Sequence, residues 1–344
     1  MDLAIEIGGA QTTNMALLTE WVQHAEKLGV KTAYSAEAWW SDAVTPLAYL
    51  ADKTSTIRLA TGIMQVTART PAMAAMTALT LHDLTDGRFI MGLGASGPQV
   101  VEGLHGVRYT KPLSRLRETV EICRMIFAGE KVAYDGQVFQ LPLPDSEGKA
   151  IKIAHEPTDV PIYLATLGPN ALKYTGAAAN GWLGTSFSPD HPDAHMDYIR
   201  AGAEEAGRPL SEIDLSVSVR VEIGEDVEEM IDRRRKQVAF NMGGMGSADT
   251  NFYNDAFKRA GYEEDAIAIQ RLWLDGKRDD AASRVPDAMI TEFQALGTPE
   301  MVRERFQKYR DAGINTLKLG LDSAPLGPER FALLEQITDL IKDI

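Results

Sequence analysis

The chain has 344 residues, of which 44% are hydrophobic, and it contains 29 glycines and 16 prolines. This composition is typical of a folded globular protein and excludes the disordered and collagen-like classes. The formal net charge of −14 argues against nucleic acid and anionic lipid as partners, because an acidic surface repels both. A small anionic ligand stays compatible with this charge, since it needs only a local cluster of donors.

The single cysteine, Cys123, lies in a segment where apolar residues recur at helical spacing. One cysteine excludes a disulfide within the chain and a thiolate metal site, and we expect it to pack in the core. Residues 1–6 are acidic and lack the basic start of a signal peptide. No apolar run reaches the roughly 18 residues that a membrane span needs. We therefore expect a cytoplasmic protein with no membrane partner.

Short apolar strands alternate with longer amphipathic helices along nearly the whole chain. The predicted strands cover residues 3–7, 32–35, 57–63, 88–93, 161–165, 181–184, 215–221 and 316–319. The predicted helices that follow them cover residues 13–28, 46–54, 72–84, 113–127, 170–178, 193–206, 226–240 and 328–341. Eight strand–helix pairs in strict alternation favour an α/β fold, a (β/α)8 TIM barrel. An open, doubly wound sheet is the alternative.

Two segments interrupt this alternation. Residues 129–160 contain a predicted hairpin over 131–140, with its turn around Asp135-Gly136. Residues 242–297 form an insertion before the last repeat, and it opens with the glycine-rich stretch 242–246. An insertion at this level of a barrel forms either part of a binding mouth or a surface excursion. We expect one barrel domain over residues 1–344 with these two insertions.

The most informative motif is the glycine-rich run that follows the fourth predicted strand. Residues 92–97 match the G-x-G-x-x-G pattern of dinucleotide-binding proteins. That function requires the motif to open a helix, but Pro98 follows the third glycine and the next predicted helix begins only near Leu113. The motif also comes after three complete strand–helix units. We therefore interpret it as one ligand-facing loop of the barrel, with little side-chain bulk to keep a ligand from the backbone.

In a barrel of this kind the ligand site lies at the carboxyl ends of the strands. Backbone, hydroxyl and aromatic groups dominate there, with few charged groups, and this set is typical of a site where a bound cofactor carries the chemistry. The six histidines show no metal-ligand spacing, so we expect no metal. His191 and His195 fall near the start of a polar helix, where we expect them to be solvated.

Several of these segments together carry a family resemblance. They are Thr61-Gly-Ile-Met-Gln-Val-Thr-Ala-Arg-Thr-Pro-Ala-Met-Ala-Ala-Met76, Asp86-Gly-Arg-Phe-Ile-Met-Gly-Leu-Gly-Ala-Ser-Gly-Pro98, Lys111-Pro-Leu-Ser-Arg-Leu-Arg-Glu118, Pro161-Ile-Tyr-Leu-Ala-Thr-Leu-Gly-Pro169 and Asn180-Gly-Trp182. On these residues the chain resembles the bacterial-luciferase-like superfamily of flavin and deazaflavin oxidoreductases. Within it, the chain is most similar to the branch that uses coenzyme F420, a 5-deazaflavin.

The resemblance implies a set of cofactor contacts. A non-proline cis peptide at Gly62–Ile63 would support the back of the ring, and the loop from Gly94 to Pro98 would line the polar edge of the ring. Backbone amides at the start of the fifth helix would hold the phosphate of the side chain. The implied cofactor-binding residues are Glu37, Trp39, Thr61, Gly62, Ile63, Gln65, Gly94, Ser96, Gly97, Pro98, Ala165, Thr166, Leu167, Gly168, Pro169 and Asn170.

One departure from the family pattern affects the residue that would transfer a proton during the reaction. Many deazaflavin relatives carry an Asp-His pair at the end of strand two, where this chain has Glu37-Ala38-Trp39. Glu37 is then the first candidate for a proton-handling catalytic group and Glu6 is the second, with the substrate or water as further sources. The implied activity is hydride transfer between the deazaflavin carbon-5 and a small organic substrate. The alternatives are an FMN-dependent monooxygenase and a non-catalytic flavin-binding barrel.

The helices predicted at 46–54 and 72–84 carry more apolar residues than one barrel face needs. These residues are Leu47, Tyr49, Leu50, Met73, Met76 and Leu79. The resemblance implies a homodimer through this region, and a fully buried helix is the alternative. Trp39, Trp40, the loop 105–109 and the 242–297 insertion are expected to form the walls of an apolar substrate pocket.

Overall fold

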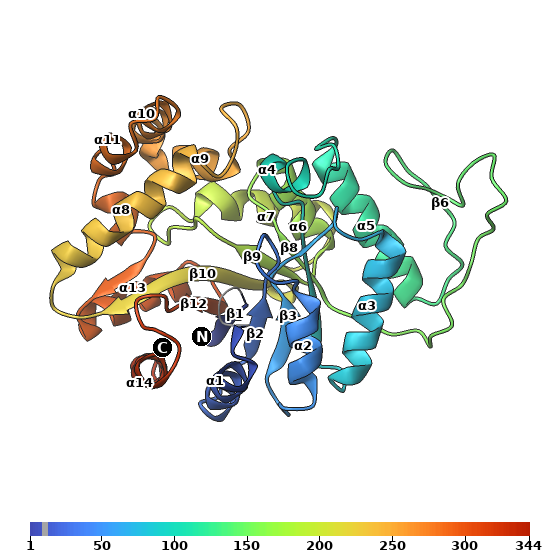
Figure 1. Ribbon diagram of the computed structural model, residues 1–344, viewed down its shortest axis with the longest axis horizontal. Helices are drawn as coiled ribbons and strands as arrows, with labels where there is room; N and C mark the ends of the chain where they lie inside the picture. The colour runs from blue at the N-terminus through green and yellow to red at the C-terminus, as the bar shows by residue number, and fades with distance from the viewer. Residues whose placement is uncertain (9–12) are drawn as a thin grey trace.

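The computed structural model describes residues 1–8 and 13–344 and shows a barrel of parallel strands surrounded by helices (Figure 1). The barrel strands are β1 (Asp2–Ile7), β2 (Thr32–Ser35), β3 (Arg58–Thr61), β5 (Phe89–Gly94), β8 (Ile162–Ala165), β9 (Gly181–Gly184), β10 (Asp214–Ile223) and β12 (Thr316–Gly320). Each strand pairs in parallel with the next, and β12 pairs with β1 to close the barrel. The closure confirms the predicted (β/α)8 TIM barrel and excludes the open sheet.

The helices predicted after the strands are present within a few residues of their expected ends. They are α1 (Met15–Lys27), α2 (Val44–Ala51), α3 (Pro71–Leu84), α5 (Pro112–Phe127), α6 (Pro169–Ala178), α7 (Asp193–Glu205), α8 (Val227–Gly243) and α14 (Pro328–Leu340). Local chemistry sets several of these ends: the Thr70 hydroxyl accepts from the backbone N–H of Met73, and Pro71 occupies the first turn of α3. None of the described helices is long and apolar enough to cross a bilayer.

The core has two layers that keep the strand ends rigid. Most buried apolar side chains lie between the strands and the surrounding helices, and Cys123 is fully buried among them, as predicted. Burial raises the pKa of the Cys123 thiol to about 12. A smaller cluster fills the barrel itself, and it comprises Ala4, Tyr34, Ala60, Ile90, Tyr163 and Leu183, with Ile63 and Ala165 packed against it.

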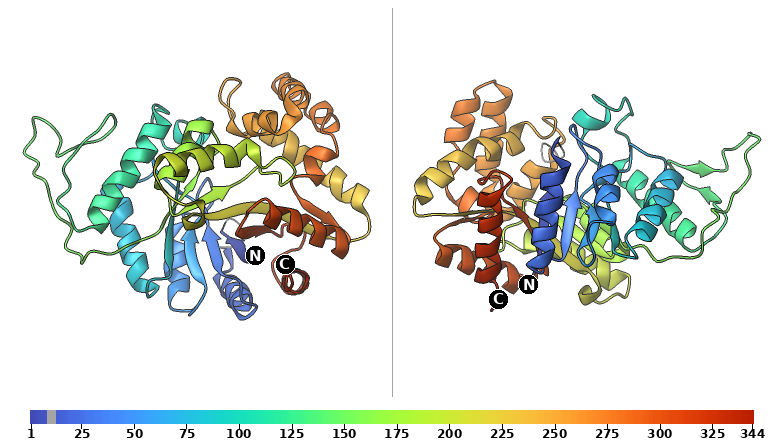
Figure 2. Two further views of the ribbon diagram at one scale, coloured as in Figure 1. Left: turned by 180° about the vertical axis from the view of Figure 1, so that it is seen from behind. Right: turned by 60° about the horizontal axis from the view of Figure 1, so that its bottom comes forward.

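The first interruption forms the predicted hairpin. β6 (Tyr134–Asp135) pairs antiparallel with β7 (Gln140–Leu141), and the hairpin projects away from the barrel (Figure 2). The buried Glu118 carboxylate of α5 accepts from three backbone N–H groups of the turn, at residues 137–139. This carboxylate therefore attaches the hairpin to the barrel helix.

The second interruption is mainly helical and has its own core. It contains α9 (Phe252–Phe257), the π-helical turn Lys258–Tyr262, α10 (Glu263–Leu274), α11 (Arg278–Ser283), α12 (Ala288–Thr291) and β11 (Ala295–Gly297), and α13 (Pro299–Asp311) follows. A separate cluster of buried apolar residues packs these helices against α8. Figure 1 shows α9, α10 and α11 grouped together beside α8 on one side of the barrel.

Two expectations were wrong. A helix does begin directly after the glycine motif, because α4 (Pro98–Val101) has Gly97 as its N-cap and Pro98 in its first turn. The other error concerns His195, which is only 1% exposed and packs between the rings of Trp182 and Phe187. Burial lowers the pKa of His195 to about 3, so its ring is neutral near pH 7.

Candidate active site

The strand ends meet at one mouth of the barrel, and β3 is interrupted there. β3 ends at Thr61, a cis peptide joins Gly62 to Ile63 as predicted, and β4 (Met64–Gln65) then pairs with β5. The Thr61 hydroxyl donates to the carbonyl oxygen of Gly92 and accepts from its N–H, both at 2.8 Å. This side chain therefore connects β3 to β5 at the interruption.

Glycine and alanine leave little side-chain bulk around Ile63 of the cis peptide. A Cβ atom added at Gly94 would lie 2.8 Å from Ile63 Cδ1 and 3.5 Å from the Ala165 methyl group. A Cβ atom added at Gly62 would lie 2.9 Å from the Tyr34 ring. We call the surface formed by Gly62, Ile63, Gly94 and Ala165 the platform.

Buried polar atoms without a partner lie beside the platform. Within the described part of the chain, Gln65 Oε1, Thr67 Oγ1 and Ser35 Oγ make no hydrogen bond although they are buried. The Gln65 amide is fixed in place, because its Nε2 donates to the carbonyl oxygen of Glu37 at 3.1 Å. Buried polar atoms normally have partners. The free acceptor Gln65 Oε1 fits the polar edge of a flavin-type ring, which has an N–H group between two carbonyls.

Glu37 holds the loop that follows β2. Its Oε1 accepts from the Arg69 guanidinium at 2.7 Å and from the N–H of Gln65 at 2.8 Å, and its Oε2 accepts from the N–H of Ala43 at 3.2 Å. The Glu37 side chain is 8% exposed. This carboxylate is therefore well placed to position the loop against β4. Trp39 of the same loop is 64% exposed.

Glu6 lies next to the platform inside the barrel mouth. It pairs in register with Tyr34, the residue whose ring lies below Gly62. Lys318 Nζ is 3.1 Å from Glu6 Oε1. Burial raises the pKa of Glu6, but the positive charges of Lys318 and Arg220 outweigh this effect and hold the pKa below its ordinary value. Glu6 is therefore a carboxylate at neutral pH.

The loop after β8 begins a helix beside the other edge of the platform. Gly168 is the N-cap of α6 and Pro169 occupies its first turn, while Asn170 is exposed. The Thr166 hydroxyl shares a hydrogen bond with the Thr175 hydroxyl at 2.8 Å, which attaches the loop to α6. The free amides of a helix N-terminus attract anions. The arrangement fits the phosphate site that the family resemblance implies.

The 242–297 insertion covers both ligand loops. A Cβ atom added at Gly97 would lie 3.8 Å from the carbonyl oxygen of Met245, and one added at Gly168 would lie 3.9 Å from the Phe252 ring. Arg259 donates to the carbonyl oxygen of Leu167 at 2.7 Å. These contacts favour a binding mouth over a surface excursion. Sequence reasoning missed Arg259, because nothing local marks this arginine within a polar helical stretch.

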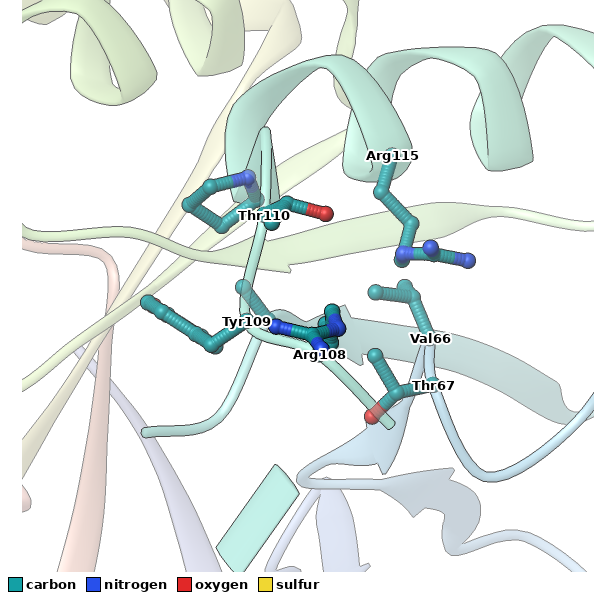
Figure 3. A pocket seen from close by; sticks show the side chains of 8 residues that line it. Val66, Thr67, Arg108, Tyr109, Thr110 and Arg115 are labelled. Atoms are coloured by element: carbon teal, nitrogen blue, oxygen red, sulfur yellow. The ribbon is translucent and has the colours of Figure 1, made fainter. Parts of the chain in front are cut away.

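A shallow cleft opens beside Ala95 of the loop 94–98 (Figure 3). We call it the arginine cleft, and its lining residues are Val66, Thr67, Ala95, Arg108, Tyr109, Thr110, Pro112 and Arg115. The Tyr109 hydroxyl donates to the carbonyl oxygen of Ser96 at 3.2 Å and so joins the two sides of the cleft. The sequence predicted no role for either arginine, although Arg108 lies in the loop 105–109 expected to line the substrate pocket and Arg115 lies in the segment 111–118 that carries the resemblance.

The family model described as luciferase-like monooxygenase matches residues 4–316. The chain belongs to this family. A Mycobacterium tuberculosis protein named as a coenzyme F420-dependent oxidoreductase is 35% identical over 99% of this chain and 98% of its own length. The 5,10-methylenetetrahydromethanopterin reductase of Archaeoglobus fulgidus is 30% identical over 83% of this chain and 82% of its own length. The chain is therefore an enzyme of the oxidoreductase class.

Solved structures give the same result for the fold. The coenzyme F420-dependent tetrahydromethanopterin reductase of Methanopyrus kandleri superposes with a TM-score of 0.77 at 25% identity, over 98% of this chain and 97% of that one. An F420-dependent secondary alcohol dehydrogenase, solved with an F420–acetone adduct, also reaches 0.77 at 18% identity over the full length of both chains. This luciferase-like enzyme thus shares its whole barrel with both proteins.

The structure gathers most of the predicted site residues of this luciferase-like enzyme at one mouth of the barrel. The platform, the loop 94–98 and the start of α6 follow the neighbouring strands β3, β5 and β8. Glu6 lies near the end of β1, and Glu37 follows β2. Trp39 differs from the rest, since its side chain is mostly in solvent.

Proposed function

We propose that the chain is a coenzyme F420-dependent oxidoreductase that transfers a hydride between the deazaflavin and a small organic substrate. The observation that carries this proposal is the platform at the cis peptide, with the unpartnered acceptor Gln65 Oε1 beside it. The close relative named as F420-dependent favours the deazaflavin over FMN. When bound, the deazaflavin supplies a hydride donor or acceptor at its carbon-5.

Residues of this chain would hold the cofactor through three kinds of contact. The platform would support the ring, and Gln65 Oε1 would accept from the ring N–H. The backbone of the loop 94–98 would follow the polar edge of the ring, and the amides at the start of α6 would attract the phosphate. The insertion would exclude water through Met245 and Phe252, since both lie against these loops.

We infer that Glu6 rather than Glu37 handles the proton. Glu37 already accepts three hydrogen bonds from the protein, whereas Lys318 is the only residue that forms an ion pair with Glu6 among the described residues. The ionised Glu6 carboxylate is ready to accept a proton from a substrate hydroxyl as the substrate is oxidised. In the reverse direction, the protonated Glu6 would return that proton.

Binding and turnover test the proposal separately. The purified protein is titrated with F420 and with FMN while cofactor absorbance and fluorescence are followed. We expect F420 to bind, and tight binding of FMN with none of F420 would overturn the proposal. Glu6→Gln should then lower turnover about 10²–10⁴-fold with little change in F420 affinity. F420 binding without turnover over a broad panel of alcohols and carbonyl compounds would favour the non-catalytic barrel.

We also propose that the enzyme is a homodimer through α2 and α3. Of the residues predicted for this surface, Tyr49, Met73 and Met76 are between 41% and 51% exposed, whereas the three leucines pack in the core. The exposed residues lie on neighbouring helices and form an apolar patch. Sedimentation of the wild type and of Met73→Glu/Met76→Glu tests this directly. A monomeric wild type would refute the dimer.

A further inference from the structure

We propose that the arginine cleft is a subsite for the acidic tail of the cofactor. This inference rests on the proposed function, because it assigns part of the same bound molecule. The F420 side chain continues past its ribityl group into a phosphodiester and glutamate carboxylates, so its far end is anionic. Arginine binds carboxylates and phosphates through paired N–H donors, which makes two arginines on one cleft a fitting partner.

The two arginines carry positive charge that the protein does not neutralise. Within residues 1–8 and 13–344, neither Arg108 nor Arg115 forms an ion pair with a carboxylate. The nearby acidic groups are already used: Glu102 accepts from the N–H of Tyr109 at 2.9 Å, and Glu37 pairs with Arg69. On a chain with a net charge of −14, such a local excess of positive charge attracts anions to one place.

The cleft is also built to hold its donors in place. The Arg115 guanidinium lies 5.3 Å from the centre of the Phe139 ring, so the hairpin supports its position. Figure 3 shows Arg108 and Arg115 beside Val66 and Thr67, with the arginines coming from the chain around the start of α5. The buried Thr67 Oγ1 has no hydrogen-bond partner among the described residues. The cleft therefore offers a hydroxyl as well as two guanidinium groups.

The position of the cleft connects it to the platform. Its wall includes Ala95, the residue after Gly94 of the platform. Val66 and Thr67 follow Gln65, whose free Oε1 we assign to the ring. One side of the cleft thus continues each of the two segments that border the ring site. The phosphate that we assign to the start of α6 lies after β8, the neighbour of β5, so the tail beyond it would pass the loop 94–98 to reach the arginines.

The test compares two ligands that share a ring and differ in the tail. The protein is titrated by fluorescence with F420 and with the tail-free deazaflavin that ends at its ribityl group. The variant is Arg108→Gln/Arg115→Gln, and the matched control is Arg117→Gln/Lys149→Gln, which loses the same charge at exposed positions outside the cleft. We expect the dissociation constant for F420 to rise about 10–100-fold in the variant and less than twofold in the control. The tail-free ligand should bind all three proteins equally, and added salt should weaken F420 binding in the wild type more than in the variant.

Other outcomes would overturn the assignment. Equal F420 affinity in variant and control would refute it, and so would an equal loss for both ligands, which would indicate a damaged platform. An acidic substrate is the other source of the same chemistry. Unchanged F420 affinity, together with arginine-dependent binding of triglutamate to the F420-loaded enzyme, would assign the cleft to a substrate instead. If the wild type binds no F420, the proposed function fails, and triglutamate titration of the unloaded wild type and variant then tests the anion subsite alone.

Discussion

Replacing Glu37 by alanine tests whether this residue positions the active-site loop. The substitution removes the partner of Arg69 and leaves the N–H groups of Gln65 and Ala43 without their acceptor. Breaking a fully buried ion pair costs about 3–5 kcal/mol. Here Glu37 is 8% and Arg69 19% exposed, so solvent reduces this cost to about 2 kcal/mol. The two amides add about 1 kcal/mol, so we expect the free energy of unfolding to fall by about 3 kcal/mol.

Urea unfolding at pH 7, followed by tryptophan fluorescence, measures this change. Glu20→Ala is the matched control, since it removes an exposed carboxylate from α1. In the double variant Glu37→Ala/Arg69→Met, the free energy of unfolding should fall by about 1 kcal/mol less than the sum of the two single decreases. The reason is that no unpaired Arg69 guanidinium is then left in the structure. A loss below about 0.5 kcal/mol in Glu37→Ala, the range of ordinary surface substitutions, would refute the positioning role.

Glu37→Gln separates positioning from proton transfer. The amide keeps the size of the side chain and an oxygen that accepts from Gln65, so a positioning residue should keep turnover within about tenfold of the wild type. A proton-handling residue would instead lose about 10²–10⁴-fold in turnover at nearly unchanged stability. The second result would make Glu37 the proton-handling group again, as expected from the sequence.

Three further predictions concern the core and the platform. The ring of His195 has a pKa of about 3 when folded, well below its ordinary 6.5, so the unfolded state binds more protons and stability is lost as the pH falls through this window. Below pH 6.5 the free energy of unfolding of the wild type should therefore fall by up to about 1.4 kcal/mol per pH unit more than that of His195→Leu. Urea unfolding of the two proteins with the same pH dependence would contradict this. Cys123 should react with a thiol reagent only in denaturant, and modification of the native enzyme would refute its burial. Gly92→Ala should fail to fold because its Cβ atom would lie 1.8 Å from a backbone oxygen, whereas Gly94→Ala meets only the end of the Ile63 side chain and should fold with weaker F420 binding. Equal soluble yields of the two variants, or unchanged F420 affinity in Gly94→Ala, would contradict this pair of expectations.

The alternation of strands and helices was readable from the sequence because each barrel strand is buried on both faces. Helix ends were readable where capping chemistry is local, as at Thr70. The short helix α4 was missed because a single turn leaves no periodic pattern. His195 was misplaced although Ile199 and Gly202, four and seven residues later, are buried on the same face of α7. The helical period therefore indicated that His195 lies on the buried face, but its polar neighbours favoured a solvated position.

The side-chain contacts of the site could not be predicted from the sequence for a different reason, since they join residues far apart in the chain. Arg69 meets Glu37 from 32 residues away, and Arg259 meets Leu167 from 92 residues away. Such pairs depend on the closed barrel and on how the insertion folds back over it. The sequence supplied the residue types, whereas the geometry decides which of them are already paired.

That distinction underlies the different roles that we propose for the two glutamates. Both are carboxylates near the ends of neighbouring strands, so residue type and position in the sequence do not distinguish their roles. The structure surrounds Glu37 with two backbone amides and an arginine, and these donors hold the loop in a fixed position. Glu6 is held by Lys318 from the adjacent strand β12, and it faces the open mouth beside Tyr34. A proton-handling group needs access to the substrate as well as charge, and for this reason we propose Glu6 for that role.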